Sequence, residues 1–211
     1  MQLDLIFSLV ILIVSVILHE VAHGYMANYL GDPTAKLQGR LTLNPISHID
    51  PVGSILLPLM LVLTNSPIRI GYAKPVPYNP HYLPGKYDEA LVAGAGPGTN
   101  ILLALVFGLL IRFGSTNMNP ALFNAFVIIV FTNIGLALFN LVPIPPLDGS
   151  KVLAGILPGG VGRAYADFRA NFERFGVLTG TLVLLVLLYV LGPYFNIAVA
   201  SVFHILTGHG L

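Results

Sequence analysis

The chain of 211 residues contains no cysteine and no tryptophan, and only 9% of its residues are Asp, Glu, Lys or Arg. Without cysteine there is no disulfide, no thiolate metal site and no thiol nucleophile. Soluble domains carry roughly 25% charged residues. A chain that is 55% hydrophobic and this poor in charge is therefore predicted to be an integral membrane protein. Ten Lys and Arg balance nine Asp and Glu without a basic stripe, so we expect no nucleic-acid partner.

Long apolar runs predict an all-α polytopic membrane protein with about four to six transmembrane helices. The runs long enough to span a bilayer are 5–30, 88–113, 120–142 and 175–191. The run 51–64 is shorter and holds Pro58, which favours a re-entrant or interfacial segment. Whether it crosses, and whether the short run 193–206 crosses, stays open.

The stretch between the first two core helices is predicted to contain short β-like segments. Residues 34–50 are polar and rich in turn formers and β-branched residues, and 37–43 and 68–76 both have β-like composition. Such strands would offer an exposed edge to an extended peptide. The alternative is a pair of surface loops with no binding role.

Lysine and arginine are distributed unevenly between the loops that join the predicted spans, which indicates an orientation. Only Arg112 lies near the loop between the second and third confident spans. If 51–64 does not cross, every strongly positive loop lies on one side. We therefore predict an external N-terminus and cytoplasmic positive loops, and those loops carry Lys36, Arg40, Arg69, Lys74, Lys86, Lys151, Arg163, Arg169 and Arg174.

The first apolar run contains the sequence His19-Glu20-Val21-Ala22-His23. Placing an ionisable side chain at bilayer depth costs free energy, so such residues are interpreted first as functional. Residues four apart share one helix face, so His19 and His23 can reach one metal ion, with Glu20 beside it to deprotonate a bound water. This pattern predicts a zinc hydrolase acting within the membrane. Its alternative is two histidines hydrogen-bonded in a helix-bundle core.

A catalytic zinc site needs a third protein ligand, and Asp148 is the best candidate. It follows Pro143, Pro145 and Pro146, which break the helix, and broken backbone at membrane depth is tolerated where it lines a cavity. Gly149 allows the backbone to approach closely. The alternative is that Asp148 caps the helix that follows.

Together these motifs resemble the site-2 proteases, the intramembrane zinc metalloproteases of peptidase family M50. The resemblance rests on His19–His23, on Ala95–Asn100 (AGPGTN) as the middle motif and on Asn140–Gly149 (NLVPIPPLDG), in that order over about residues 15–150. It implies His19, His23 and Asp148 as ligands of one Zn²⁺ per chain and Glu20 as general base. It also implies that Asn140 lies near the metal and polarises the scissile carbonyl or holds its oxyanion.

Residues 39–45 (GRLTLNP) are similar to a compact prokaryotic branch of the family, and no insertion is long enough for a PDZ or CBS domain. We therefore expect a single membrane-embedded domain over 1–211, with a catalytic core over about 5–157 and C-terminal helices over about 175–207. The implied location is a prokaryotic cell membrane, with the active site towards the cytoplasm. The implied partners are the lipid bilayer and a membrane-protein substrate cut in or near its transmembrane segment, as in regulated intramembrane proteolysis.

Several residues keep a second interpretation. Asn140 and Asn100 could each form an interhelical hydrogen bond instead of serving the site, and Gly96 and Gly98 favour close helix packing. The remaining histidines are expected in loops or at the interface: His48, His81, His204 and His209. The alternative functions are a non-catalytic metal-binding membrane protein, a metal transporter, or a degenerate homologue that acts as a binding partner. The sequence leaves the oligomeric state open.

Overall fold

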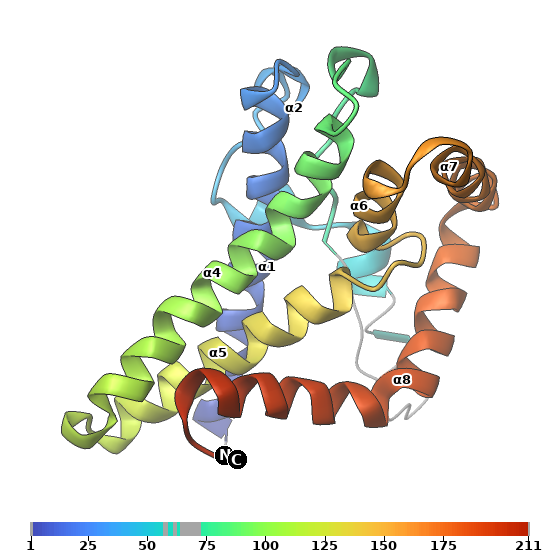
Figure 1. The fold of residues 1–211 in the computed structure, drawn as a ribbon. Helices are drawn as coiled ribbons and strands as arrows, with labels where there is room; N and C mark the ends of the chain where they lie inside the picture. Colours follow the sequence, from blue (N-terminus) through green and yellow to red (C-terminus); the bar gives the residue numbers. More distant parts are fainter. Residues whose placement is uncertain (1, 57–58, 61–62, 64–72, 211) are drawn as a thin grey trace.

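The computed structural model describes residues 2–56, 59–60, 63 and 73–210, and these form a helical bundle (Figure 1). Four helices have more than twenty residues each and account for most of the fold. They are α1 (Gln2–Tyr29), α4 (Asp88–Gly114), α5 (Pro120–Asn140) and α8 (Gly176–Thr207). The shorter elements are α2 (Thr34–Leu37), η1 (Pro45–His48), η2 (Pro51–Leu56), η3 (Pro80–Tyr82), η4 (Ser115–Asn117), α6 (Asp148–Ile156) and α7 (Gly159–Glu173).

Among the described residues, four helical stretches are long and apolar enough to cross a membrane: Ile6–Tyr29, Asp88–Asn117, Pro120–Asn140 and Tyr189–Thr207. Their outward surfaces are apolar, and Leu9 and Val10 on α1 are about half exposed. Several of their polar side chains lie inside, including Ser15, Asn100 and Asn133. This arrangement suits a lipid solvent and confirms the prediction of an all-α polytopic membrane protein.

The last turns of α1 and the first turns of α4 lie at the same end of the molecule (Figure 1), where Ala27 and Val92 share a small buried cluster. The chain between these helices therefore leaves and re-enters the bundle at one end. The run 51–64 lies within this connection. Residues 51–56 of that run form η2, while 57–58, 61–62 and 64 lie outside the described residues.

The predicted β-like segments do not form strands in the described part of the chain. For 37–43 the prediction is wrong, because side chains satisfy the neighbouring backbone donors locally and favour tight turns. Asp32 Oδ1 accepts from Thr34 N at 2.9 Å at the start of α2, and Asn44 Oδ1 accepts from Ile46 N at 3.1 Å at the start of η1. Of the stretch 68–76, residues 68–72 lie outside the description and 73–76 run as irregular backbone.

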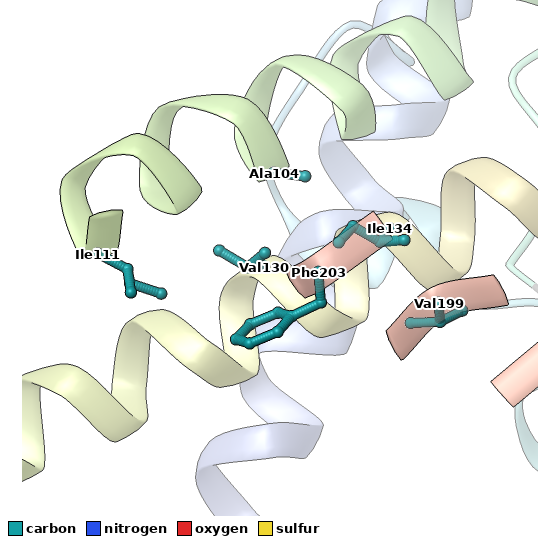
Figure 2. Close-up of a cluster of buried hydrophobic side chains, with 6 residues drawn as sticks. All are labelled: Ala104, Ile111, Val130, Ile134, Val199 and Phe203. Atoms are coloured by element: carbon teal, nitrogen blue, oxygen red, sulfur yellow. The ribbon is translucent and has the colours of Figure 1, made fainter. Parts of the chain in front are cut away.

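The C-terminal helix α8 has two limbs that meet at a steep angle (Figure 1), and Pro193 lies inside it. The predicted span 175–191 falls mainly in the first limb. The run 193–206 belongs to the second limb, which is one of the four candidate spans. This limb packs on α4 and α5, where Figure 2 shows the main apolar core, made of Ala104, Ile111, Val130, Ile134, Val199 and Phe203.

Replacing Phe203 by alanine should destabilise the fold, because its 1% exposed ring fills the contact between α8, α4 and α5. Large-to-small changes of buried aromatic residues cost roughly 3–5 kcal/mol. Thermal unfolding of the detergent-solubilised protein measures the loss. Ile205→Ala is the matched control on the same helix, because Ile205 is 72% exposed and should shift the midpoint much less. Equal shifts for both variants would contradict this account of the core.

Candidate metal centre

Two histidines of α1 and one aspartate of α6 bring their ligand atoms together. Nε2 of His19 lies 3.1 Å from Nε2 of His23 and 3.1 Å from Oδ2 of Asp148. The distance from His23 Nε2 to Asp148 Oδ2 is 3.3 Å. Two ligands at about 2.0–2.1 Å from a tetrahedral zinc ion lie about 3.3 Å apart, so this donor set fits zinc. In the described part of the chain this is the one group of three such residues close enough to share a metal.

Local sequence explains why Asp148 faces the histidines. The break after α5 turns the chain back, and Asp148 is the first residue of α6, after Leu147 at the N-cap. A leucine side chain cannot cap, and the Asp148 carboxylate points to the imidazoles instead of to its own helix. Gly149 makes the turn possible, because a Cβ there would lie under 3.0 Å from the carbonyl oxygens of Leu141 and Val142.

Ionisation of Asp148 also suits metal binding. Burial raises the pKa of this carboxyl, whereas hydrogen bonds and positive charge from His19 and His23, when their Nε2 atoms carry a proton in place of a metal, lower it. The balance holds the pKa below the ordinary value of an aspartate. Asp148 is therefore a carboxylate, which is the form that binds a cation.

Each histidine uses its other ring nitrogen on a fixed acceptor. His23 Nδ1 donates to the backbone carbonyl of Val92 at 2.7 Å, and His19 Nδ1 donates to Asn100 Oδ1 at 2.6 Å. Because Nδ1 carries the proton in both rings, both Nε2 atoms present lone pairs to the same point as the Asp148 carboxylate. Three acceptors that face one another are stable around a cation.

The direction of the His19 hydrogen bond follows from a buried chain of amides. The carbonyl of Ile129 can only accept, so it fixes Nδ2 of Asn133, which donates to it at 2.9 Å and to Ser15 Oγ at 3.0 Å. Asn133 Oδ1 then accepts from Asn100 Nδ2 at 2.8 Å, which leaves Asn100 Oδ1 for His19. Sequence reasoning missed Asn133 and Ser15, and left Asn100 undecided. The available signal was an amide side chain inside an apolar run long enough to span the bilayer, because such a group is expensive there without a partner.

Gly96 places α4 against the two imidazoles. A Cβ on Gly96 would lie under 3.0 Å from Nε2 of His19 and Nε2 of His23, where a metal ion would bind. Sequence analysis favoured helix packing for both Gly96 and Gly98. The structure separates them, because a Cβ on Gly98 would meet nothing within 4 Å.

The side chains of the two residues expected to act on the substrate hydrogen-bond to backbone groups. Glu20 is half-buried, and its Oε2 accepts from the backbone N–H of Val76 at 3.0 Å. Asn140 Nδ2 donates to the carbonyl of Leu136, one turn earlier in α5, at 3.0 Å. The hydrogen bonds described for Asn140 do not include one to the ligand cluster, and its role stays a prediction.

Gly96→Ala should weaken metal binding sharply, because the added methyl group would occupy the space between the two Nε2 atoms. Gly98→Ala adds the same methyl group to the same helix in open space, and should keep the metal. Zinc content of the purified variants, measured by elemental analysis at matched protein concentration, tests this. Equal zinc content in both variants would show that Gly96 does not border the metal position.

Comparison with known proteins places the chain. The sequence-family model described as peptidase family M50 matches residues 109–187 of this chain. The protein named "Putative zinc metalloprotease YwhC" from Bacillus subtilis is 41% identical over 163 residues, which cover 74% of this chain and 71% of that protein. Two proteins named "Putative zinc metalloprotease Rip2", from Mycolicibacterium smegmatis and Mycobacterium tuberculosis, are each 29% identical over 67% of this chain and 53% of their own length. No solved structure matches significantly.

The alignment to the Bacillus relative covers most of both chains at an identity that shows common family membership. The family match includes Asp148 and the proline-rich break before it. The chain belongs to peptidase family M50, the site-2 protease family, and is a multi-pass membrane zinc metallopeptidase.

Proposed function

We propose that this metallopeptidase cuts peptide bonds in or near transmembrane segments of other membrane proteins, with one zinc ion per chain held by His19, His23 and Asp148. The observation that carries the proposal is the convergence of these three ligand groups within 4.8 Å of one another. Both histidines belong to a helix long and apolar enough to span the bilayer. A hydrolytic site at this depth suits a substrate that is itself in the membrane.

Each residue of the site has a role in this proposal. When bound, Zn²⁺ supplies Lewis acidity and lowers the pKa of water to about 7. Glu20 takes a proton from the attacking water and passes it to the leaving amine. Asn140 donates to the oxyanion after its amide leaves the carbonyl of Leu136. The Asn100–Asn133 chain keeps His19 in the tautomer that offers Nε2 to the metal.

Substrate access is proposed to be lateral, along a groove between α1 and α4. A hollow of about 650 Å³ follows this interface, and its lining includes Tyr25, Met26, Gly94 and Gly98. A neighbouring hollow of about 280 Å³ is lined by α1 together with residues 41–43 and Thr99. Their mainly apolar walls suit a chain that arrives from the lipid. At the second hollow, the irregular backbone of residues 41–43 lies beside α1, the helix that carries Glu20.

Glu20→Gln should keep zinc and lose cleavage, because the amide cannot accept the proton of the attacking water. Loss of a general base lowers rates about 10²–10⁴-fold. His23→Ala should lose both zinc and cleavage. Capture of uncut membrane proteins with Glu20→Gln identifies a single-span substrate, and cleavage of that substrate with and without a zinc chelator then measures activity.

The same assay separates the alternative functions. A metal transporter or a non-catalytic binding protein would hold zinc and leave the captured protein intact at every chelator concentration. Full cleavage by Glu20→Gln would show that another group is the base.

We further propose that the metal centre faces the cytoplasm. The end of α1, the start of α4, α6 and α7 all lie at one end of the molecule, and the turn between α4 and α5 lies at the other (Figure 1). Lys36, Lys86, Lys151 and Arg163 belong to the first end, and the positive-inside rule places them in the cytoplasm.

The absence of cysteine makes this orientation directly testable. Lys86→Cys and Asn117→Cys each introduce one exposed thiol, at opposite ends of α4. In intact cells a membrane-impermeant maleimide should label Asn117→Cys, whereas Lys86→Cys should react only after permeabilisation. The reverse pattern would invert the topology.

A further inference from the structure

The carboxylate of Glu20 is held by a short proline-rich segment, residues 74–79, which we call the proline strap. Val76 stands between Pro75 and Pro77, so its N–H is the one backbone donor of this tripeptide, because proline has none. That N–H donates to Glu20 Oε2 at 3.0 Å. Val76 is 6% exposed, so the hydrogen bond forms at a buried position.

A glycine of α1 allows the proline strap to pack closely on this helix. Gly24 lies four residues after Glu20 and therefore on the same helix face. A Cβ on Gly24 would lie under 3.0 Å from side-chain atoms of Val76 and Leu41. The absent side chain thus lets the strap reach the helix one turn beyond the carboxylate that it contacts.

Arg40 fixes the first half of the strap. Its Nη2 donates to the carbonyl of Lys74 at 2.9 Å and to the carbonyl of Pro75 at 3.3 Å. The N–H of Lys74 donates to the carbonyl of His48 at 2.8 Å. The guanidinium is buried, with Arg40 8% exposed, so these contacts are shielded from water. Both peptide groups before Val76 are therefore held in place.

Further polar contacts fix the second half of the strap. Asn79 N donates to Oδ2 of the fully buried Asp32 at 2.6 Å. Tyr78 donates its hydroxyl to Glu89 Oε1 at 3.1 Å, and its ring lies 5.0 Å below the ammonium of Lys151. Burial raises the pKa of Tyr78, so the phenol stays protonated and remains a donor. The strap is thus anchored on both sides of Val76.

We propose that the proline strap positions the general base, with the Val76 N–H as the contact to Glu20 and Arg40 as the positioning residue that holds the strap. This inference rests on the proposed role of Glu20. One carboxylate oxygen is held by the N–H, which leaves Oε1 for the attacking water. A glutamate side chain has three rotatable bonds, and misplacement of a reacting group by about 1 Å can lower a rate 10²-fold. A fixed donor removes that freedom before substrate binds.

A proline at position 76 tests the contact directly. Val76→Pro deletes the N–H, whereas Val76→Ala shortens the side chain and keeps the N–H, so the comparison isolates one hydrogen bond. On the substrate captured with Glu20→Gln, Val76→Pro should lower kcat about 10–100-fold. KM should change little, and zinc content should match that of Val76→Ala. Arg40→Gln should show a smaller loss in kcat, and Lys36→Gln, which removes an exposed positive charge, is its control.

Thermal unfolding gives a readout that does not depend on catalysis. The difference between the unfolding midpoints of Val76→Pro and Val76→Ala is measured once with Glu20 present and once with Glu20→Ala. We expect a clear difference with Glu20 and little difference with Glu20→Ala, because the acceptor has then been removed. A difference that persists without Glu20 would overturn the proposal, as would equal kcat values for the two Val76 variants.

Failure of the proposed function gives a different pattern. If Glu20→Gln cleaves at the wild-type rate, Glu20 is not the base. The proposal that the proline strap positions a catalytic base is then wrong as well. If Glu20→Gln is inactive while Val76→Pro and Val76→Ala turn over equally, the base assignment stands and the strap proposal is wrong.

Discussion

Everything at the site depends on satisfying three ionisable groups within an apolar bundle. Two imidazoles and a carboxylate would be costly among lipid-facing helices, and each therefore needs polar partners. The outer nitrogen of each ring has one: Asn100 for His19, and the carbonyl of Val92 for His23. What remains are two nitrogen lone pairs and a carboxylate oxygen at mutual distances of 3.1–3.3 Å. A divalent cation is the partner that satisfies all three together.

Close backbone approach is the second requirement, and glycine meets it three times. Gly96 lets α4 pack closely against the imidazoles, and Gly149 lets the start of α6 pack against the end of α5. Gly24 lets the proline strap pack against α1. In each case a Cβ would lie under 3.0 Å from the opposing atoms. The site is thus a place where five segments come closer together than side chains would normally permit: α1, α4, the end of α5, the start of α6 and the proline strap.

The parts of this arrangement that follow a local code could be predicted from the sequence. The i, i+4 spacing of His19 and His23 and the proline break before Asp148 each have a direct geometric meaning. All three side chains face the same point in the structure. The orientation of α4 relative to α1 followed from the requirement that Ala95–Asn100 lie at the depth of the metal. Apolar length predicted the spans 5–30, 88–113 and 120–142, whereas the fourth candidate span in the described residues is Tyr189–Thr207 and not the predicted 175–191.

Other features depend on contacts between distant residues, and the local sequence does not identify the partners. β-branched composition favoured strands in 37–43, but short polar side chains at Asp32 and Asn44 satisfied the backbone in turns instead. Asn133 and Val76 acquire their roles only when α5 and the strap pack on α1. The histidines of α1 lie 81 residues from Asn100 and 129 from Asp148, taking His19 as the reference.

That last separation has a consequence for biosynthesis. If Asp148 supplies the third ligand, a nascent chain that has inserted α1, α4 and α5 still holds only two of the three groups. Synthesis must pass the proline-rich break, and α6 must dock, before a hydrolytic centre exists. On that assignment, the order of the elements along the chain delays hydrolytic activity until α1, α4 and α5 have been made and α6 has docked on them.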